Sequence, residues 1–90
     1  MLVALIARDK PGAQEIRKAN REAHVAYLKE TGAVALAGPF LNGAGDMTGS
    51  LIVLDVPDMA AAEAWAANDP YAKAGLFASV TLDAWKKVIG

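Results

Sequence analysis

The sequence contains no cysteine in its 90 residues. It therefore cannot form a disulfide, use a thiolate nucleophile or hold zinc through sulfur. It has a single histidine, His24, and its carboxylates do not cluster along the chain. Zinc and related metals are held by several histidine, cysteine or carboxylate ligands at once. A protein-only metal site is not expected, and haem or metal binding through His24 is the least favoured interpretation.

No excess of charge of either sign marks a surface for a charged polymer. The formal net charge is −1, and the nine lysines and arginines are scattered along the chain. Proteins that bind a nucleic-acid backbone concentrate basic residues on one surface. Long apolar runs are also missing, and the run at 2–8 lacks a preceding basic region and a following cleavage pattern. We therefore predict a cytoplasmic protein with neither nucleic-acid nor membrane partners.

Apolar residues are abundant for so short a chain. They make up 54% of the sequence, against 21% charged residues. A chain of this length fits one domain, residues 1–90, and buries only about 60% of the surface that its unfolded form exposes. The apolar excess therefore predicts a further surface that is buried against a partner.

Turn signals and hydrophobic periodicity divide the chain into strands and helices. Gly32 follows a long run without Gly or Pro, as expected at a helix end. Asp58 and Asp69 stand where helix N-caps are expected, the second directly before Pro70. The loop at 41–46 contains Asn and Gly and predicts a hairpin. The expected strands are 2–8, 34–40, 49–56 and 76–88, and the expected helical segments are 13–31, 59–67 and 70–74.

This order predicts an α+β domain of ferredoxin-like βαββαβ topology, with an antiparallel four-stranded sheet and two helices on one face. The strands at 2–8 and 49–56 are apolar at both odd and even positions, so both faces of the sheet need cover. A second copy of the sheet is the simplest cover for the face without helices. We predict a homodimer that encloses a pocket between the two sheets. The alternative is a monomer that exposes a costly apolar face.

Two strands carry residues that suit the wall of a pocket. Strict alternation places polar and aromatic side chains on one face of the last strand, namely Phe77, Ser79, Thr81, Asp83 and Trp85. The strand at 34–40 contains small residues that leave volume in front of the sheet, namely Ala35, Ala37 and Gly38. We interpret the combination as a pocket wall. Ordinary packing between subunits explains it equally well.

His24 is the only side chain of the chain whose ordinary titration lies near neutral pH. Helical spacing predicts a buried face that consists of Ile16, Ala19, Ala23 and Tyr27. A flank beside that face holds Arg17, Arg21, His24 and Leu28. At the edge of the buried face, the imidazole of His24 can act as a base, or it can be a passive boundary residue.

Asp69 is the candidate partner of His24. An aspartate before a proline is a good N-cap and needs no catalytic role. The two roles are compatible, because one carboxylate oxygen can cap the helical turn while the other orients an imidazole N–H.

Short motifs in order cover nearly the whole chain: Arg21-Glu22-Ala23-His24-Val25-Ala26-Tyr27-Leu28, Ala37-Gly38-Pro39-Phe40, Gly49-Ser50-Leu51, Asn68-Asp69-Pro70-Tyr71, Ala74-Gly75-Leu76-Phe77 and Asp83-Ala84-Trp85-Lys86. Together they resemble the YciI-like (YCII-related) family. The resemblance implies a ferredoxin-like, dimeric α+β barrel, related in architecture to small cofactor-free monooxygenases and muconolactone isomerases. It also implies a His–Asp pair in a cleft, at positions that His24 and Asp69 occupy. One branch of the family resembles a dehydrochlorinase that acts on a substituted hydroquinone.

The leading hypothesis is an enzyme without a cofactor, of the lyase, isomerase or dehydrohalogenase type, that acts on a small cyclic or anionic metabolite. In it, His24 moves a proton while Asp69 orients the imidazole and stabilises its charged form. The residues expected to bind the substrate or shape the cavity are Arg17, Arg21, Gly38, Ser50, Tyr71, Phe77 and Trp85. The alternative is a non-catalytic ligand-binding or accessory module, in which His24 and Asp69 form only a structural hydrogen bond.

Overall fold

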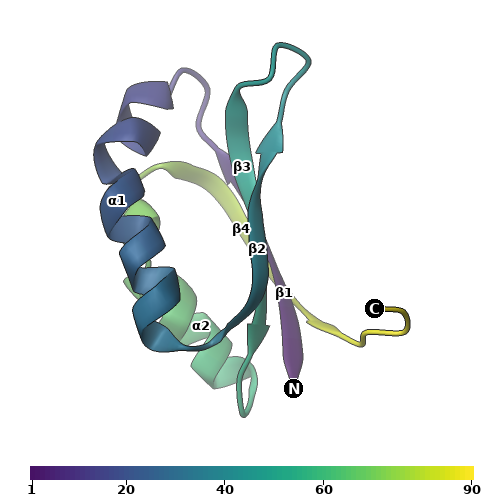
Figure 1. Ribbon diagram of the computed structural model, residues 1–90. Helices are drawn as coiled ribbons and strands as arrows, with labels where there is room; N and C mark the ends of the chain where they lie inside the picture. Colours follow the sequence, from purple (N-terminus) through teal and green to yellow (C-terminus); the bar gives the residue numbers. More distant parts are fainter.

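The computed structural model describes residues 1–90 and shows a four-stranded antiparallel sheet with the helices on one of its faces (Figure 1). The strands are β1 (Leu2–Asp9), β2 (Val34–Leu41), β3 (Met47–Asp55) and β4 (Phe77–Trp85), and the helices are α1 (Gln14–Thr31), α2 (Met59–Asn68) and the single turn α3 (Pro70–Lys73). The strand order across the sheet is β2-β3-β1-β4. The expected α+β fold with ferredoxin-like βαββαβ topology is therefore confirmed. None of the helices combines the length and the apolar character that crossing a membrane requires.

Local signals place most element ends where the sequence predicts them. Gly32 ends α1 with a left-handed φ of 63°, which glycine adopts without strain. The side chain of Asp58 accepts a hydrogen bond from the N–H of Ala61 at 2.8 Å and so begins α2. The strand β4 ends earlier than expected, because Trp85 already pairs with Leu2, the first residue of β1. Residues 86–90 have no strand to pair with and extend away from the sheet (Figure 1).

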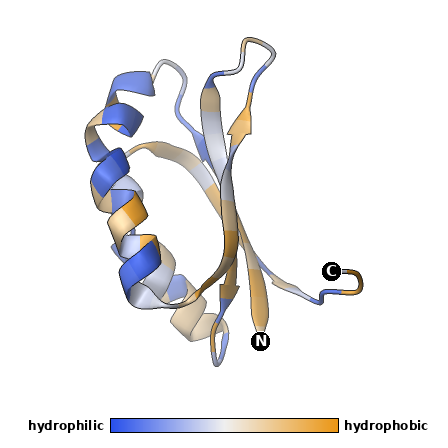
Figure 2. Ribbon diagram, in the orientation of Figure 1, coloured by the Kyte–Doolittle hydropathy of each residue, from blue (hydrophilic) through white to orange (hydrophobic).

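Of the α1 residues that the sequence predicts to be buried, only Tyr27 packs against the core. Ile16, Ala19 and Ala23 are exposed, whereas the buried residues of the helix are Arg17 and His24. The polar side chains can face inward because each has a buried carboxylate partner from another element. Two of the three exposed residues are alanines, which have little apolar surface to bury. Figure 2 shows α1 as a largely hydrophilic helix beside a more apolar sheet.

The main core lies between α2 and the helix side of β1 and β3. Its buried members are Val3, Leu5, Ala7, Ile52, Leu54, Val56, Ala62 and Trp65. A second, smaller cluster joins Ala13, Tyr71 and Leu76 where α1 begins and α3 ends. Neither cluster has a buried member from β2. The space between α1 and β2 is therefore not part of the packed core.

The face of the sheet that carries no helix, here called the helix-free face, is also apolar. The register of β1 and β3 places Ile6 beside Leu51 on this face. Leu36 in β2 and Trp85 in β4 extend the apolar surface toward the two edges and are 51% and 43% exposed. As the sequence predicts, both sides of the two central strands are apolar, and only one side has helices over it.

A bulge in β4 divides its side chains between two faces in a way that strict alternation does not predict. The register between β1 and β4 shifts after Arg8, so that Phe77 pairs with Asp9. Phe77 therefore lies on the helix side, where its ring meets the ring of Tyr71 edge-on at 6.0 Å. The residues that remain on the helix-free face are Ser79, Thr81, Asp83 and Trp85. The expectation that Phe77 and Trp85 share one pocket wall is wrong.

Gly49 allows β3 to approach β1 closely. A Cβ atom at this position would lie 2.5 Å from the carbonyl oxygen of Ala7 and 3.2 Å from the ring of Phe40. The first distance is far inside van der Waals contact, so any other residue would push the two strands apart. The next residue, Ser50, is 3% exposed.

Candidate active site

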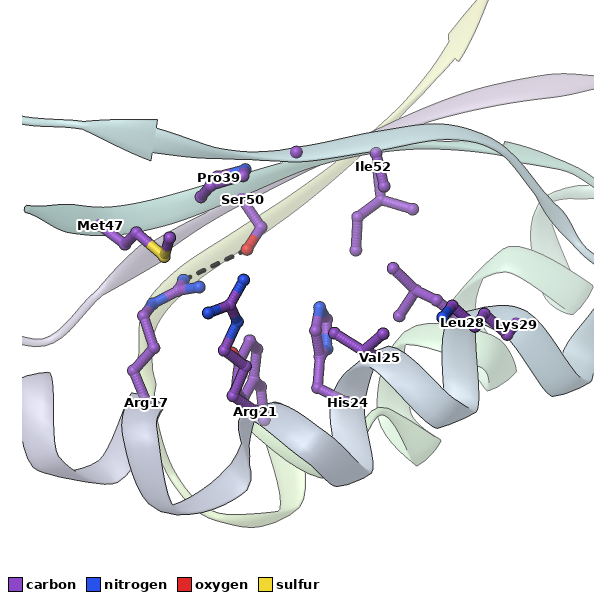
Figure 3. A pocket seen from close by; sticks show the side chains of 13 residues that line it. Arg17, Arg21, His24, Val25, Leu28, Lys29, Pro39, Met47, Ser50 and Ile52 are labelled. Carbon is purple, nitrogen blue, oxygen red and sulfur yellow. Dashed lines mark hydrogen bonds between the residues drawn. The ribbon is translucent and has the colours of Figure 1, made fainter.

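A cavity of about 290 Å³ opens between α1 and the helix side of β2 and β3 (Figure 3). Its polar lining residues are Arg17, Arg21, His24, Lys29, Ser50 and Tyr71, and its other lining residues are Val25, Leu28, Ala37, Gly38, Pro39, Met47 and Ile52. The site residues therefore line a cavity within one chain, on the side of the helices, and not the face between two sheets where the sequence places them. The small residues Ala37 and Gly38 leave volume as expected, but this volume lies under α1.

His24 and Asp69 meet at the base of this cavity. The Nδ1 atom of His24 lies 2.7 Å from Oδ1 of Asp69, and the two side chains are only 8% and 1% exposed. The same Oδ1 atom accepts the backbone N–H of Tyr71 at 2.9 Å and so caps α3. The sequence suggests that each carboxylate oxygen takes one role, but one oxygen takes both. The other oxygen, Oδ2, is buried without a hydrogen-bond partner.

The imidazole of His24 is fixed in two ways. Asp69 fixes its rotation through Nδ1, and the ring of Tyr71 stacks on it with centroids 3.8 Å apart and planes 13° apart. A carboxylate only accepts hydrogen bonds, so Nδ1 is the nitrogen that donates, and in the neutral imidazole Nε2 is the nitrogen without a proton. No protein group bonds to Nε2. Figure 3 shows the His24 ring standing in the cavity, so the unprotonated nitrogen is available to a bound molecule.

Arg17 is held by a residue that the sequence did not single out. Its Nε atom donates to Oδ2 of Asp9 at 2.7 Å, and its Nη2 atom donates to Oδ1 at 2.9 Å. Both side chains are almost fully buried. Burial disfavours the charged guanidinium, but the hydrogen bonds and the negative charge of Asp9 outweigh it and raise the pKa of Arg17. Arg17 is thus a permanent cation whose charge Asp9 already neutralises.

Arg21 and Lys29 give the cavity its available positive charge. Both residues are exposed and line the cavity. The three ion pairs of the chain involve neither of them. Of the two arginines expected to hold an anion, Arg21 is therefore the one without a carboxylate partner.

Tyr71 links these groups. Its ring stacks on His24, and the guanidinium carbon of Arg17 lies 4.7 Å from its centroid. Burial raises the pKa of the Tyr71 hydroxyl, although the positive charges of Arg17 and Arg21 act in the opposite direction. The phenol therefore stays neutral at physiological pH and packs as an aromatic wall.

The structure brings together most of the residues that the sequence singled out. Six of them line the cavity, namely Arg17, Arg21, His24, Gly38, Ser50 and Tyr71. Asp69 lies directly behind His24, and Phe77 packs behind Tyr71. Trp85 lies on the helix-free face and does not line this cavity.

The sequence does not single out Asp9, Met47 or Ile52 as site residues. Asp9 stands in a Pro-Gly turn region, Met47 enters a strand, and Ile52 is one of several apolar strand residues. No local pattern in the sequence marks any of the three as part of a site. No group of three or more potential metal-ligating side chains gathers anywhere in the structure.

The strand order and the helices on one face define a ferredoxin-like α+β domain. A cavity with a buried His–Asp pair lies beneath its first helix, α1. The model of the YCII-related domain matches residues 1–86. The chain belongs to this family. It is 36% identical over 97 positions to Protein YciI of Escherichia coli O6:H1, an alignment that covers 98% of this chain and 99% of that protein.

The chain is similar to several solved structures, including the following two. The first is 5-chloro-2-hydroxyhydroquinone dehydrochlorinase (TftG) from Burkholderia phenoliruptrix AC1100, in complex with 2,5-dihydroxybenzoquinone. It is 34% identical, with a TM-score of 0.89, over 96% of this chain and 94% of that chain. The second, an antibiotic biosynthesis monooxygenase, is 18% identical with a TM-score of 0.61, over 99% of this chain and 100% of that chain. At that identity, the second likeness concerns the fold alone.

Proposed function

We propose that the protein is a cofactor-independent enzyme in which His24 transfers a proton to and from a small, oxygenated ring compound. One observation carries the proposal: an imidazole bonded through Nδ1 to a buried carboxylate at 2.7 Å has its other nitrogen available in a cavity. A general base must reach its substrate with an unprotonated atom in a defined position. The pair of His24 and Asp69, with the Tyr71 stack, meets this requirement.

Asp69 stabilises the charged form of the base. When Nε2 takes a proton, the imidazole becomes positive and gains a direct ionic interaction with the carboxylate. The Oδ2 atom of Asp69 lacks a partner, so its negative charge is only partly compensated while His24 is neutral. Proton uptake by His24 supplies the missing compensation. The same proton can then return to the substrate, so that His24 acts as base and acid in turn.

The size and charge of the cavity indicate the kind of substrate. At about 290 Å³ it lies at the small end of ligand pockets, so one six-membered ring fits it. Arg21, which has no carboxylate partner, would bind a negative or oxygen-rich group. The TftG relative supports this choice, since its structure contains 2,5-dihydroxybenzoquinone. Dehydrochlorination removes a proton and a chloride ion together, and a base such as His24 would take the proton.

The protein works as a homodimer in this proposal. The helix-free face exposes Leu36 and Trp85 and places Ile6 beside Leu51. A two-fold axis would bury the same patch on each subunit. Because the cavity lies on the opposite side of the sheet, each subunit then keeps its own site, and the dimer contributes stability.

The test is a proton-exchange and turnover assay with defined compounds. Wild type is incubated in deuterated buffer with hydroxylated quinones and with 5-chloro-2-hydroxyhydroquinone, and NMR and a chloride electrode follow exchange and chloride release. We expect His24→Ala to lower the rate by about 100-fold or more, while Glu22→Ala, on the exposed side of α1, has no effect. If a compound binds but its reaction rate is the same with wild type and with His24→Ala, the protein is instead a non-catalytic binding module.

A further inference from the structure

Ser50 has a hydrogen bond on only one side. Its Oγ atom lies 3.2 Å from Nη2 of Arg17, the contact drawn as a dashed line in Figure 3. The residue is 3% exposed and lines the cavity. A buried hydroxyl normally finds partners for both its oxygen and its hydrogen. Here only the oxygen has one.

The identity of the neighbour decides the direction of this bond. An arginine guanidinium has five N–H donors and no acceptor. The Ser50 oxygen must therefore accept from Arg17, and the hydroxyl hydrogen is left to donate elsewhere. No protein acceptor bonds to it. Because Ser50 lines the cavity, the hydrogen is available to a molecule bound there. Ser50 is thus a donor to any bound molecule, polarised by the cation behind it.

Asp9 determines which N–H of Arg17 reaches Ser50. The carboxylate binds the Nε–Nη2 edge of the guanidinium with both oxygens. One N–H of Nη2 is used by Asp9, and the second points to Ser50. Bidentate pairing fixes the plane of the guanidinium, and burial protects the pair from competing water. Arg17 cannot turn toward the cavity as a mobile anion-binding group without breaking this pair.

We propose that Asp9 is a positioning residue and Ser50 a specificity residue: through Arg17, Asp9 holds the Ser50 hydroxyl as a donor that selects ligands with an oxygen acceptor. The acceptor would lie at the end of the cavity near Ser50 and Arg21. Figure 3 shows Ile52 and Leu28 beyond His24, away from Arg17, and the hydrocarbon part of the ligand would lie there. The inference rests on the proposed use of this cavity as the substrate site.

The experiment measures equilibrium binding of acetophenone, a single ring with a neutral carbonyl that only accepts hydrogen bonds, by titration calorimetry. A neutral probe is needed because Asp9→Asn changes the charge beside the cavity. The proteins are wild type, Asp9→Asn, Ser50→Ala and the double variant. We expect Ser50→Ala to raise the Kd by about tenfold, the upper end of what one hydrogen bond contributes. Asp9→Asn should also weaken binding. In the Ser50→Ala background, however, it should change the Kd by less than about twofold, because Asp9 acts through Ser50.

The controls separate this proposal from the catalytic one. α-Methylstyrene, which has the same shape but no acceptor, should not bind, and Ser50→Thr, which keeps the hydroxyl, should bind acetophenone as wild type does. No step depends on proton transfer, so His24→Gln should keep the same double-mutant pattern even if it abolishes turnover. Additive effects of Asp9→Asn and Ser50→Ala, an unchanged Kd in Ser50→Ala, or no acetophenone binding by wild type at millimolar concentration each overturn the proposal. If Asp9→Asn fails to fold, Ser50→Ala and Ser50→Thr still decide it.

Discussion

The ring of Tyr71 lies parallel to the imidazole of His24, with the two centroids 3.8 Å apart. Asp69, two positions earlier, binds the edge of the same imidazole. A single turn, α3, thus supplies both the carboxylate that sets the rotation of the histidine and the aromatic ring that sets its plane. Pro70 between them favours the start of that turn. The segment Asp69-Pro70-Tyr71 is therefore one structural unit that supports a side chain on α1.

Asp69→Asn should separate the capping role of Asp69 from its electrostatic role. Asparagine is as good an N-cap as aspartate, so we expect the free energy of unfolding to change by no more than about 1 kcal/mol. The imidazolium loses its counter-charge, and turnover should fall by about 100-fold or more. Asp69→Ala should lose both roles and unfold more easily. Urea unfolding and the exchange assay check this, and an Asn variant with full activity would contradict it.

The buried pair of Asp9 and Arg17 should matter to stability more than an exposed ion pair would. Asp9→Ala leaves the guanidinium buried without a counter-charge, since both side chains are under 10% exposed. We expect a loss of about 3–5 kcal/mol in the free energy of unfolding. The control is Asp58→Ala, which removes an exposed helix cap and should cost about 1 kcal/mol. Equal losses in the two variants would show that the pair is not specially stabilising.

Stability should decline at alkaline pH because two phenols are held neutral by the fold. Burial raises the pKa of Tyr71, and burial together with Asp69 raises the pKa of Tyr27. In the unfolded chain a tyrosine titrates near pH 10. The native state therefore keeps these protons to higher pH than the unfolded state. The resulting stabilisation is complete below about pH 10 and is lost as pH rises through the folded pKa values.

Urea unfolding at several values between about pH 8 and pH 11 measures this effect. The double variant Tyr27→Phe/Tyr71→Phe should lose less stability over the upper part of this range than wild type. Its stability at pH 8 will be slightly lower, because the hydroxyl of Tyr27 donates to the carbonyl of Trp65 at 2.8 Å. An equally steep alkaline decline in both proteins would mean that other groups cause it.

The proposed homodimer should depend on the helix-free face and not on α1. Leu51→Glu places a carboxylate in the middle of that face, where a two-fold axis would bring two copies together. We expect wild type to sediment as a dimer at micromolar concentration and Leu51→Glu to sediment as a monomer. Ile16→Glu, on the exposed side of α1, should leave the dimer intact. A monomeric wild type would contradict the proposal.

The order of the elements was predictable from local signals, because caps and turns depend on neighbouring residues. Asp58, Gly32 and the Asp69-Pro70 pair each begin or end a helix in the way their chemistry favours. The sequence also singled out His24 and Asp69 as a candidate pair. Their separation was not predictable, since it depends on how α1 packs against α3.

The errors have physical causes that act over long distances. The bulge after Arg8 shifts the register, so Phe77 and Trp85, which share parity in the sequence, lie on opposite faces. Most of the inward face of α1 was wrongly predicted because hydrogen bonding to Asp9 and Asp69 makes burial of Arg17 and His24 favourable. A sequence pattern records polarity but not the partner that satisfies it.

Gly49, which has no Cβ atom, limits how the cavity can be redesigned. Any larger residue there would meet the main chain of Ala7, so position 49 of β3 has no room for a side chain. In contrast, β2 is an edge strand, and the small side chain of Ala37 lines the opening. A larger side chain at position 37 would reduce the volume of the cavity. Because no strand lies on the outer side of β2, the change would disturb no second neighbour. An engineer who wants to change ligand size should therefore vary β2 and leave β3 alone.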